Sequence, residues 1–158
     1  ALYSTAYTIK FAWKAKGKDF VVSKLEGLWW FDEEKYAHAT IDSAPVEIPR
    51  SEWKYRLLIR MPEFVSAKDI DDAKAAVISK KDITLVDEVE YFTMTEGKCV
   101  QMLHVGPFAK EPETLKEIGA FSDRHKLKRN GLHHEIYLSD FRKTAPDKLK
   151  TILREPVK

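Results

Sequence analysis

A short segment near the middle of the chain recurs near its end, and this repeat restricts the fold more than any other feature of the sequence. Leu58-Ile-Arg-Met-Pro62 returns as Ile152-Leu-Arg-Glu-Pro156. Each copy closes a series of segments with the periodicities of a helix, a strand and a second strand. A strand ending at Val105 precedes the second series, whereas no strand precedes the first. The repeat therefore predicts two β-α-β-β modules, the first of which lacks its opening strand.

The elements of the modules are predicted from the spacing of apolar residues. Helical spacing occurs over residues 2–16, 66–81 and 112–127, and Ser66 with Asp69 resembles a capping box at the start of the second helix. Alternating or continuous apolar runs predict strands at 20–31, 53–62, 89–94, 98–105, 133–139 and 151–157. Two prolines and many polar residues make 32–51 a long connection in which we expect few core contacts.

These elements predict an α+β fold with antiparallel sheets in a single domain over residues 1–158. Module one spans about 1–65, a linking helix about 66–82, and module two about 88–158. With 44% hydrophobic and 33% charged residues, the chain can bury a core and is neither disordered nor collagen-like. The sequence has one cysteine, no apolar stretch of membrane-spanning length and no targeting segment. We therefore expect a cytoplasmic protein without a membrane partner.

Polar side chains are concentrated in the predicted strand of Gly131-Leu-His-His-Glu-Ile-Tyr-Leu-Ser-Asp140. On a strand, Glu135 and Tyr137 point to one face, whereas Ile136 and Leu138 point to the other, where we expect the helices. A carboxylate sheltered by aromatic rings can act as a general base or bind a cation. The same spacing also fits an exposed strand with a solvated Glu135, and the sequence leaves both alternatives open.

Aromatic residues are the second signal. Trp29 and Trp30 are consecutive on a predicted strand, so their rings point to opposite faces and both faces need an apolar partner. Aromatic walls bind flat or cationic organic molecules by stacking and cation–π attraction. The alternative is that the tryptophans fill the core, as large aromatic residues commonly do.

Other kinds of site are disfavoured. Adjacent strand residues such as His133 and His134 face apart, so they cannot chelate one ion, and no zinc-ligand spacing accompanies them. Cys99 and His104 would also lie on opposite faces of a strand. The basic run at 124–129 suits the end of a helix, and the formal charge of +2 is too small to favour a polyanion. No glycine-rich phosphate loop is present. We expect no metal, no cofactor and no nucleic-acid partner.

Several segments resemble the GyrI-like small-molecule-binding family, in particular its stand-alone bacterial branch. They are Leu25-Glu-Gly-Leu-Trp-Trp30, Leu58-Ile-Arg-Met-Pro62, Met102-Leu-His-Val-Gly-Pro-Phe108, the segment 131–140 and Thr144-Ala-Pro-Asp-Lys-Leu-Lys-Thr-Ile-Leu153. The resemblance implies two β-α-β-β modules with an aromatic-lined ligand cleft between them. That cleft often holds a glutamate, which Glu135 matches. Members usually begin with a strand before the first helix, so this chain looks shortened at its N-terminus. Regulators of the family carry a helix-turn-helix that this sequence does not show.

A subfamily similar to this branch, the cyclopropanoid cyclopropyl hydrolases, opens the strained ring of DNA-alkylating natural products inside an aromatic cage. The resemblance implies ligand-binding roles for Trp29, Trp30, Trp53, Tyr55, Phe108 and Tyr137. Our leading hypothesis is xenobiotic detoxification by hydrolysis of a cyclopropane ring. Glu135 would activate water, and Tyr137 would be its hydrogen-bonding partner or a proton donor. One alternative is a non-catalytic module that sequesters hydrophobic or cationic compounds. Another is an inhibitor acting by protein contact, for which the sequence shows no surface signature.

Overall fold

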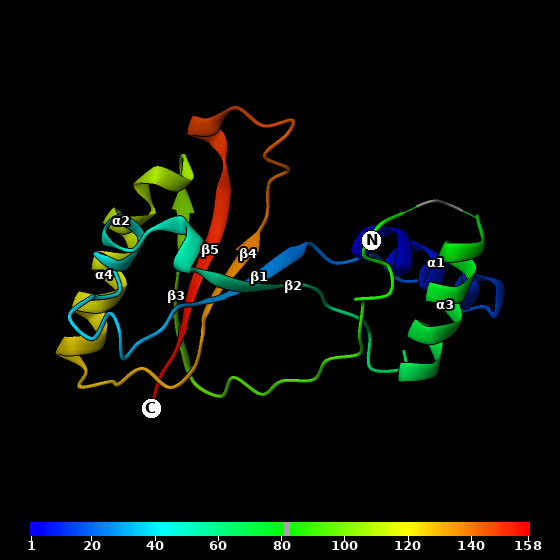
Figure 1. Cartoon of the computed structure of the whole chain (residues 1–158), viewed down its shortest axis with the longest axis horizontal. Coiled ribbons are helices and arrows are strands. Elements are labelled where there is room, and N and C mark those ends of the chain that lie inside the picture. Colours follow the sequence, from blue (N-terminus) through cyan, green and yellow to red (C-terminus); the bar gives the residue numbers. More distant parts are fainter. Residues whose placement is uncertain (81–82) are drawn as a thin grey trace. The chain divides into compact units, whose positions relative to one another are not determined.

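The computed structural model describes residues 1–80 and 83–158 and has an α+β fold (Figure 1). Residues 81–82, with which the predicted linking helix ended, lie outside the described residues. The chain divides into two compact units: unit 1 comprises residues 1–24 and 58–94, and unit 2 comprises residues 25–57 and 95–158. None of the helices in this described part of the chain has the length and apolar character that a bilayer crossing requires.

Unit 1 contains two helices that pack against each other, α1 (Leu2–Ala15) and α3 (Ala67–Lys80). Ile9 of α1 shares a buried cluster with Ile70 and Ala73 of α3, as the helical spacing predicts. The predicted capping box is confirmed, because Asp69 Oδ2 accepts hydrogen bonds from the Ser66 backbone N–H at 2.8 Å and from Ser66 Oγ at 2.7 Å. An N-terminal cap of this kind contributes about 1 kcal/mol to helix stability.

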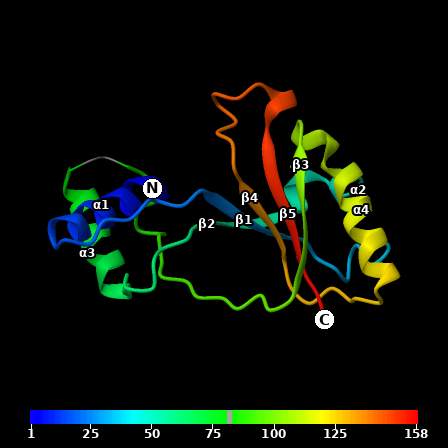
Figure 2. The same cartoon turned by 180° about the vertical axis from the view of Figure 1, so that it is seen from behind.

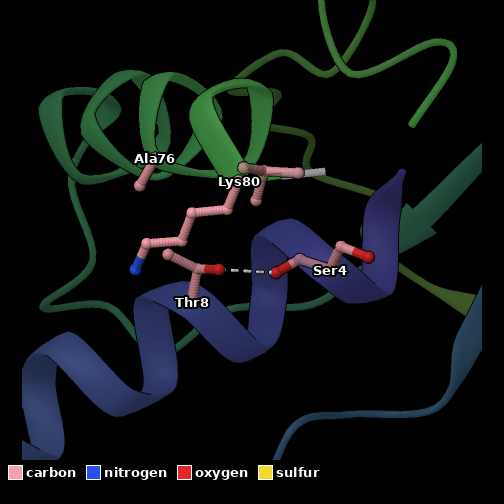
Figure 3. A pocket seen from close by; sticks show the side chains of 5 residues that line it. Ser4, Thr8, Ala76 and Lys80 are labelled. Atoms are coloured by element: carbon pink, nitrogen blue, oxygen red, sulfur yellow. Dashed lines mark hydrogen bonds between the residues drawn. The ribbon is translucent and has the colours of Figure 1, made fainter. Parts of the chain in front are cut away.

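A small recess of about 60 Å³ lies between α1 and α3 (Figure 3). It is lined by Ser4, Thr8, Ala76, Val77 and Lys80. The Thr8 hydroxyl donates to the Ser4 carbonyl oxygen at 2.8 Å, so its hydrogen bond is made within α1. A volume this small has room for a few water molecules but not for an organic ligand of ordinary size.

Unit 2 is built around a five-stranded sheet with the strand order β2-β1-β4-β5-β3 (Figures 1 and 2). The strands are β1 (Leu25–Trp30), β2 (Lys54–Ile59), β3 (Cys99–Val105), β4 (His133–Tyr137) and β5 (Lys150–Pro156). The pairs β1–β4, β4–β5 and β3–β5 are antiparallel. Both views place α2 (Ala44–Glu47) and α4 (Glu111–Arg124) on the same side of the sheet. Short 3₁₀ helices occur at η1 (Arg50–Glu52), η2 (Phe108–Lys110) and η3 (Pro146–Lys148).

The strand register decides which face of the sheet α4 covers. Glu135 lies directly opposite Leu153 in the β4–β5 pair, so their side chains share a face. Leu153 is fully buried against Leu115 and Ile118 of α4. The Glu135 face is therefore the helix-covered face. The expectation that Ile136 and Leu138 face the helices is wrong, because the pleat turns them to the other side.

The structure also corrects several predicted elements. The strand predicted at 89–94 is absent, and β3 pairs along its whole length with β5. Val89 is buried in the core of unit 1. The first predicted strand is confined to β1, without residues 20–24. The connection at 32–51 does contribute to the core, since it contains α2 and buries Ala44 and Ile48.

The repeated segments occupy different places in the sheet. Ile152–Pro156 lies in β5, which has strands on both sides, whereas β2 ends at Ile59 and lies at the edge beside β1. A local similarity of sequence thus accompanies two different environments. The two-module duplication, its boundaries and the missing first strand stay predictions.

Candidate functional site

A chain of hydrogen bonds runs across the helix-covered face of the sheet. The Trp29 indole N–H donates to Tyr137 Oη at 2.9 Å, and the Tyr137 hydroxyl donates to Glu135 Oε2 at 2.6 Å. His133 donates through Nε2 to the other oxygen, Glu135 Oε1, at 3.1 Å. Its Nδ1 bonds to Glu155. Because side chains on a strand alternate, β4 presents His133, Glu135 and Tyr137 to one face.

A glycine leaves room for this chain. Gly27 of β1 lies directly opposite Glu135. A β-carbon at Gly27 would approach Trp29 Nε1 to 2.8 Å and Tyr137 Oη to 2.9 Å, both closer than carbon atoms approach such groups in proteins. Any larger residue at position 27 would therefore force the Trp29 indole and the Tyr137 hydroxyl apart.

The Glu135 carboxylate is sheltered. Its side chain is 13% exposed, and its two oxygens accept hydrogen bonds from different residues, Tyr137 and His133. Of the two alternatives that the sequence left open, this exposure favours the sheltered carboxylate over a solvated strand residue. A catalytic role for Glu135 or Tyr137 stays a prediction.

Two neighbours of Glu135 have shifted pKa values. Burial lowers the pKa of His133, but hydrogen bonds to Glu135 and Glu155 outweigh it and raise the pKa to about 9. The ring is therefore an imidazolium at neutral pH, held between two carboxylates. Burial, followed by the charge of Glu135, raises the pKa of Tyr137 far above its usual range, so the phenol keeps its proton.

Glu111, the first residue of α4, is a site residue that the sequence analysis missed. Its side chain is buried, and Oε1 has no hydrogen-bond partner within residues 1–80 and 83–158. Burial raises the pKa of Glu111 to about 8; the charge of Glu135 adds to this shift and His133 opposes it. Glu111 therefore keeps its proton at neutral pH. Its position just before Pro112 suggested only a helix start, where acidic residues are common.

A cavity of about 330 Å³ opens beside the chain of hydrogen bonds. It is lined by Trp29, Arg50, Trp53, Tyr55 and Leu57. The rings of Trp29 and Tyr55 lie 5.1 Å apart, and the Trp53 indole N–H donates to the Ile48 carbonyl oxygen at 3.3 Å, which fixes that ring. Trp29 belongs both to this wall and to the hydrogen-bond chain that ends at Glu135.

The predicted ligand-binding residues are only partly brought together. Trp29, Trp53 and Tyr55 line the cavity, and Phe108 lies edge-on to Tyr137 with ring centres 6.2 Å apart. Trp30 does not line the cavity, because it follows Trp29 on β1 and its side chain points to the opposite face. Ligand binding by all six residues stays a prediction.

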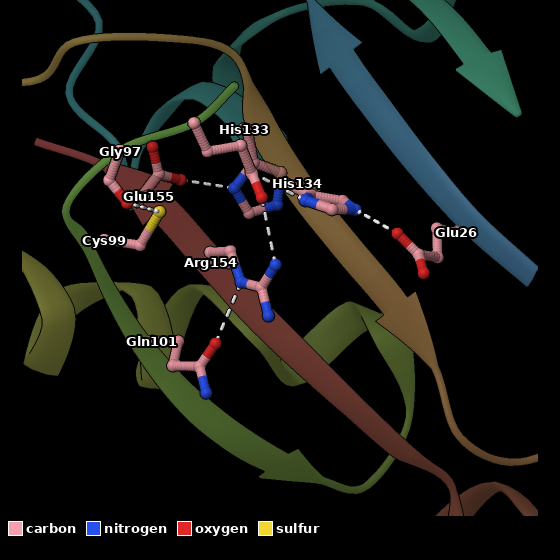
Figure 4. A network of polar contacts seen from close by, with 9 residues as sticks. Glu26, Gly97, Cys99, Gln101, His133, His134, Arg154 and Glu155 are labelled. Carbon is pink, nitrogen blue, oxygen red and sulfur yellow. Dashed lines mark hydrogen bonds and ion pairs between the residues drawn. The ribbon is translucent and has the colours of Figure 1, made fainter. Parts of the chain in front are cut away.

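A second polar cluster lies on the opposite face of the sheet (Figure 4). His134 is 1% exposed and contacts Glu26 and Glu96, each at 2.8 Å. Arg154 donates to Glu96 at 3.0 Å and to Gln101 at 2.8 Å. Burial lowers the pKa of His134, but the two carboxylates raise it on balance. As predicted, His133 and His134 face apart. Among the described residues, no group of three or more histidine, cysteine or acidic side chains is placed to hold a metal ion.

Comparison with known proteins identifies the relatives of this chain. A search of curated proteins found no match. Residues 3–158 match the model of the GyrI-like small molecule binding domain. Among solved structures, an uncharacterized conserved protein from Listeria innocua is 38% identical with a TM-score of 0.84, and the match covers 99% of this chain and 76% of that one. A hydrolase from the same organism is also 38% identical with a TM-score of 0.81, covering 99% and 75%. The chain therefore belongs to the GyrI-like small molecule binding domain family.

Proposed function

We propose that this protein is a hydrolase of xenobiotics that opens the cyclopropane ring of planar, DNA-alkylating compounds. The observation that carries the proposal is the series of hydrogen bonds that connects a sheltered carboxylate to the aromatic wall of a cavity. Glu135 is bonded to Tyr137, and Tyr137 is bonded to Trp29, which lines the cavity. The description of a Listeria innocua relative as a hydrolase supports this reaction class.

The aromatic wall would hold the flat ligand with its strained ring near Glu135. Trp29, Trp53 and Tyr55 offer ring faces whose contacts each contribute about 0.5–1.5 kcal/mol beyond area burial. Binding the ligand and a water molecule side by side lowers the activation barrier, because their translational and rotational entropy is lost on binding and not in the reaction step. The strain of the ring supplies driving force, so modest catalytic machinery suffices.

In the proposed step, water attacks a cyclopropane carbon while the carbon–carbon bond breaks. The electron pair of that bond passes through the conjugated ring to a carbonyl oxygen, which takes a proton and becomes a phenol. Glu135 receives the proton released by water, with Tyr137 and His133 holding its two oxygens in place. Glu111, neutral below pH about 8, is the proton source for the phenolate oxygen. Water is the only co-reactant, so the atoms balance without a cofactor.

Incubation with a spirocyclopropyl dienone alkylator in ¹⁸O-labelled water tests the proposal. We expect a product heavier by one labelled water, formed over many turnovers and followed by mass spectrometry. Glu135→Gln should abolish turnover but keep most of the binding, whereas Glu117→Gln, at an exposed position of α4, should change neither. Protection of the compound in a one-to-one ratio without product would instead support the sequestering module and reject the enzyme.

A further inference from the structure

The charge of the aromatic cavity points to a ligand class. Among the described residues that line it, Arg50 is the one charged residue, and the others are aromatic or aliphatic. A cationic ligand in this cavity would be repelled by the guanidinium and attracted only by ring faces. A carboxylate, sulfonate or phenolate oxygen would find in Arg50 a planar, permanently charged donor.

The backbone at Arg50 is anchored to the aromatic wall. Arg50 begins η1, directly after Pro49, which follows the buried Ile48. Its carbonyl oxygen accepts a hydrogen bond from the Trp53 backbone N–H at 3.3 Å, and the Trp53 indole donates to Ile48. The turn that carries the Arg50 side chain is therefore hydrogen-bonded to Trp53, one of the aromatic residues of the cavity wall.

The acidic groups near Arg50 and near the cavity wall have other partners. Glu52 of η1 pairs with Lys35 at 2.9 Å. Glu135, which the wall reaches through Tyr137, is held by His133. Within residues 1–80 and 83–158, the Arg50 guanidinium has no ion pair or hydrogen bond of its own. Its charge is consequently available to a ligand.

We propose that Arg50 makes this cavity selective for planar aromatic ligands that carry a negative or strongly electron-rich oxygen, in preference to cationic ones. This inference rests on the proposed function, since it assigns a substrate class to the same cavity. It also departs from the cationic ligands that the family resemblance implied. In the proposed hydrolysis, the carbonyl oxygen that becomes phenolate is the group that Arg50 would select.

Three naphthalene probes of matched shape test the selectivity by calorimetric titration at low salt: 2-naphthylacetate, 2-naphthylmethanol and 2-naphthylmethylammonium. We expect the anion to bind about tenfold more tightly than the cation, with the neutral alcohol between them. Arg50→Gln should remove this order of affinities while changing the affinity for the alcohol by no more than about twofold. Arg50→Lys should retain part of the preference for the anion. Arg124→Gln, at an exposed arginine of α4, is the matched control and should leave the order unchanged.

The outcomes separate this inference from the proposed function. If the alcohol binds but the order of the charged probes is absent or survives Arg50→Gln, the charge selectivity is rejected and the aromatic site stands. If none of the probes binds the wild-type protein, the cavity is not a ligand site and the proposed function is rejected with it. Far-UV circular dichroism of each variant verifies that it is folded.

Discussion

His133 and His134 are neighbours in the sequence, and each imidazole lies between two carboxylates, but on opposite faces of one sheet. The cluster around His134 is closed: Glu26 and Glu96 are matched by the histidine and by Arg154. The cluster around His133 is open, because it adjoins Glu111, whose Oε1 has no partner in the described part of the chain, and because it continues to an aromatic cavity. The same residue types thus serve structure where their charges are balanced and offer chemistry where one group is left without a partner.

The largest expected difference between the clusters is in turnover. Glu135→Gln should lower the rate of cyclopropane hydrolysis by 100-fold or more, as loss of a general base commonly does. Glu26→Gln, the equivalent change in the His134 cluster, should keep the rate within about twofold. Steady-state rates of both variants with the same alkylator measure the difference, and a comparable loss in the two would make the clusters functionally equivalent.

The next expected effect is on stability, and here the change in the His134 cluster should have the larger consequence. His134→Gln removes the imidazole that Glu26 and Glu96 share in a buried position. Breaking such a pair from one side commonly costs about 3–5 kcal/mol, so the free energy of unfolding should fall by that order. Urea denaturation measures it, with His38→Gln at an exposed histidine as the control. A loss below about 1 kcal/mol would show that the closed cluster is dispensable.

Gly27→Ala tests the hydrogen-bond chain of the open cluster without changing any of its polar groups. The added β-carbon would meet Trp29 Nε1 and Tyr137 Oη at 2.8 and 2.9 Å, so one of them must move. We expect a destabilisation of about 1–3 kcal/mol and a rate loss of about tenfold or more. Tryptophan fluorescence and turnover measured together check this expectation. An unchanged rate in a folded variant would remove the Trp29–Tyr137 bond from the mechanism.

The smallest expected effect is a pH dependence of stability. The folded-state pKa of Glu111 is raised from 4.5 to about 8, so between these values the folded protein holds a proton that the unfolded chain has released. Stability from this group therefore falls as pH rises from 4.5 to about 8. His133, with a folded pKa of about 9 against 6.5, contributes stability that is complete below pH 6.5 and is lost as pH rises through 9.

Glu111→Gln separates these two contributions. Between pH 5 and 8, the free energy of unfolding of the variant should fall by about 1–3 kcal/mol less than that of the wild type. The further fall as pH rises to about 9, which belongs to His133, should be the same in both proteins. Urea denaturation at a series of pH values measures both slopes. Identical curves for variant and wild type would show that Glu111 is not held neutral in the folded protein.

Much of the local structure could be predicted from periodicity. The helices at 2–16, 66–81 and 112–127 and the strand containing Glu135 are present with small shifts at their ends. The strand predicted at 89–94 is absent because β-propensity needs a partner strand, and β3 pairs with β5 instead. The helix-facing side of β4 was assigned to the wrong residues, because the pleat defines two faces without saying which one a helix covers.

The amino-acid order by itself determined which side chains share a face: His133, Glu135 and Tyr137 on one side, and His134 on the other. Only the tertiary structure decided that α4 covers the first of these faces. It also placed Glu111 beside Glu135, and it seated Arg50 among Trp29, Trp53 and Tyr55. The physical reason is that alternation is a property of each strand alone. The burial, charge balance and partners of a carboxylate depend on residues far apart in the sequence, which meet only when the sheet and its helix have packed.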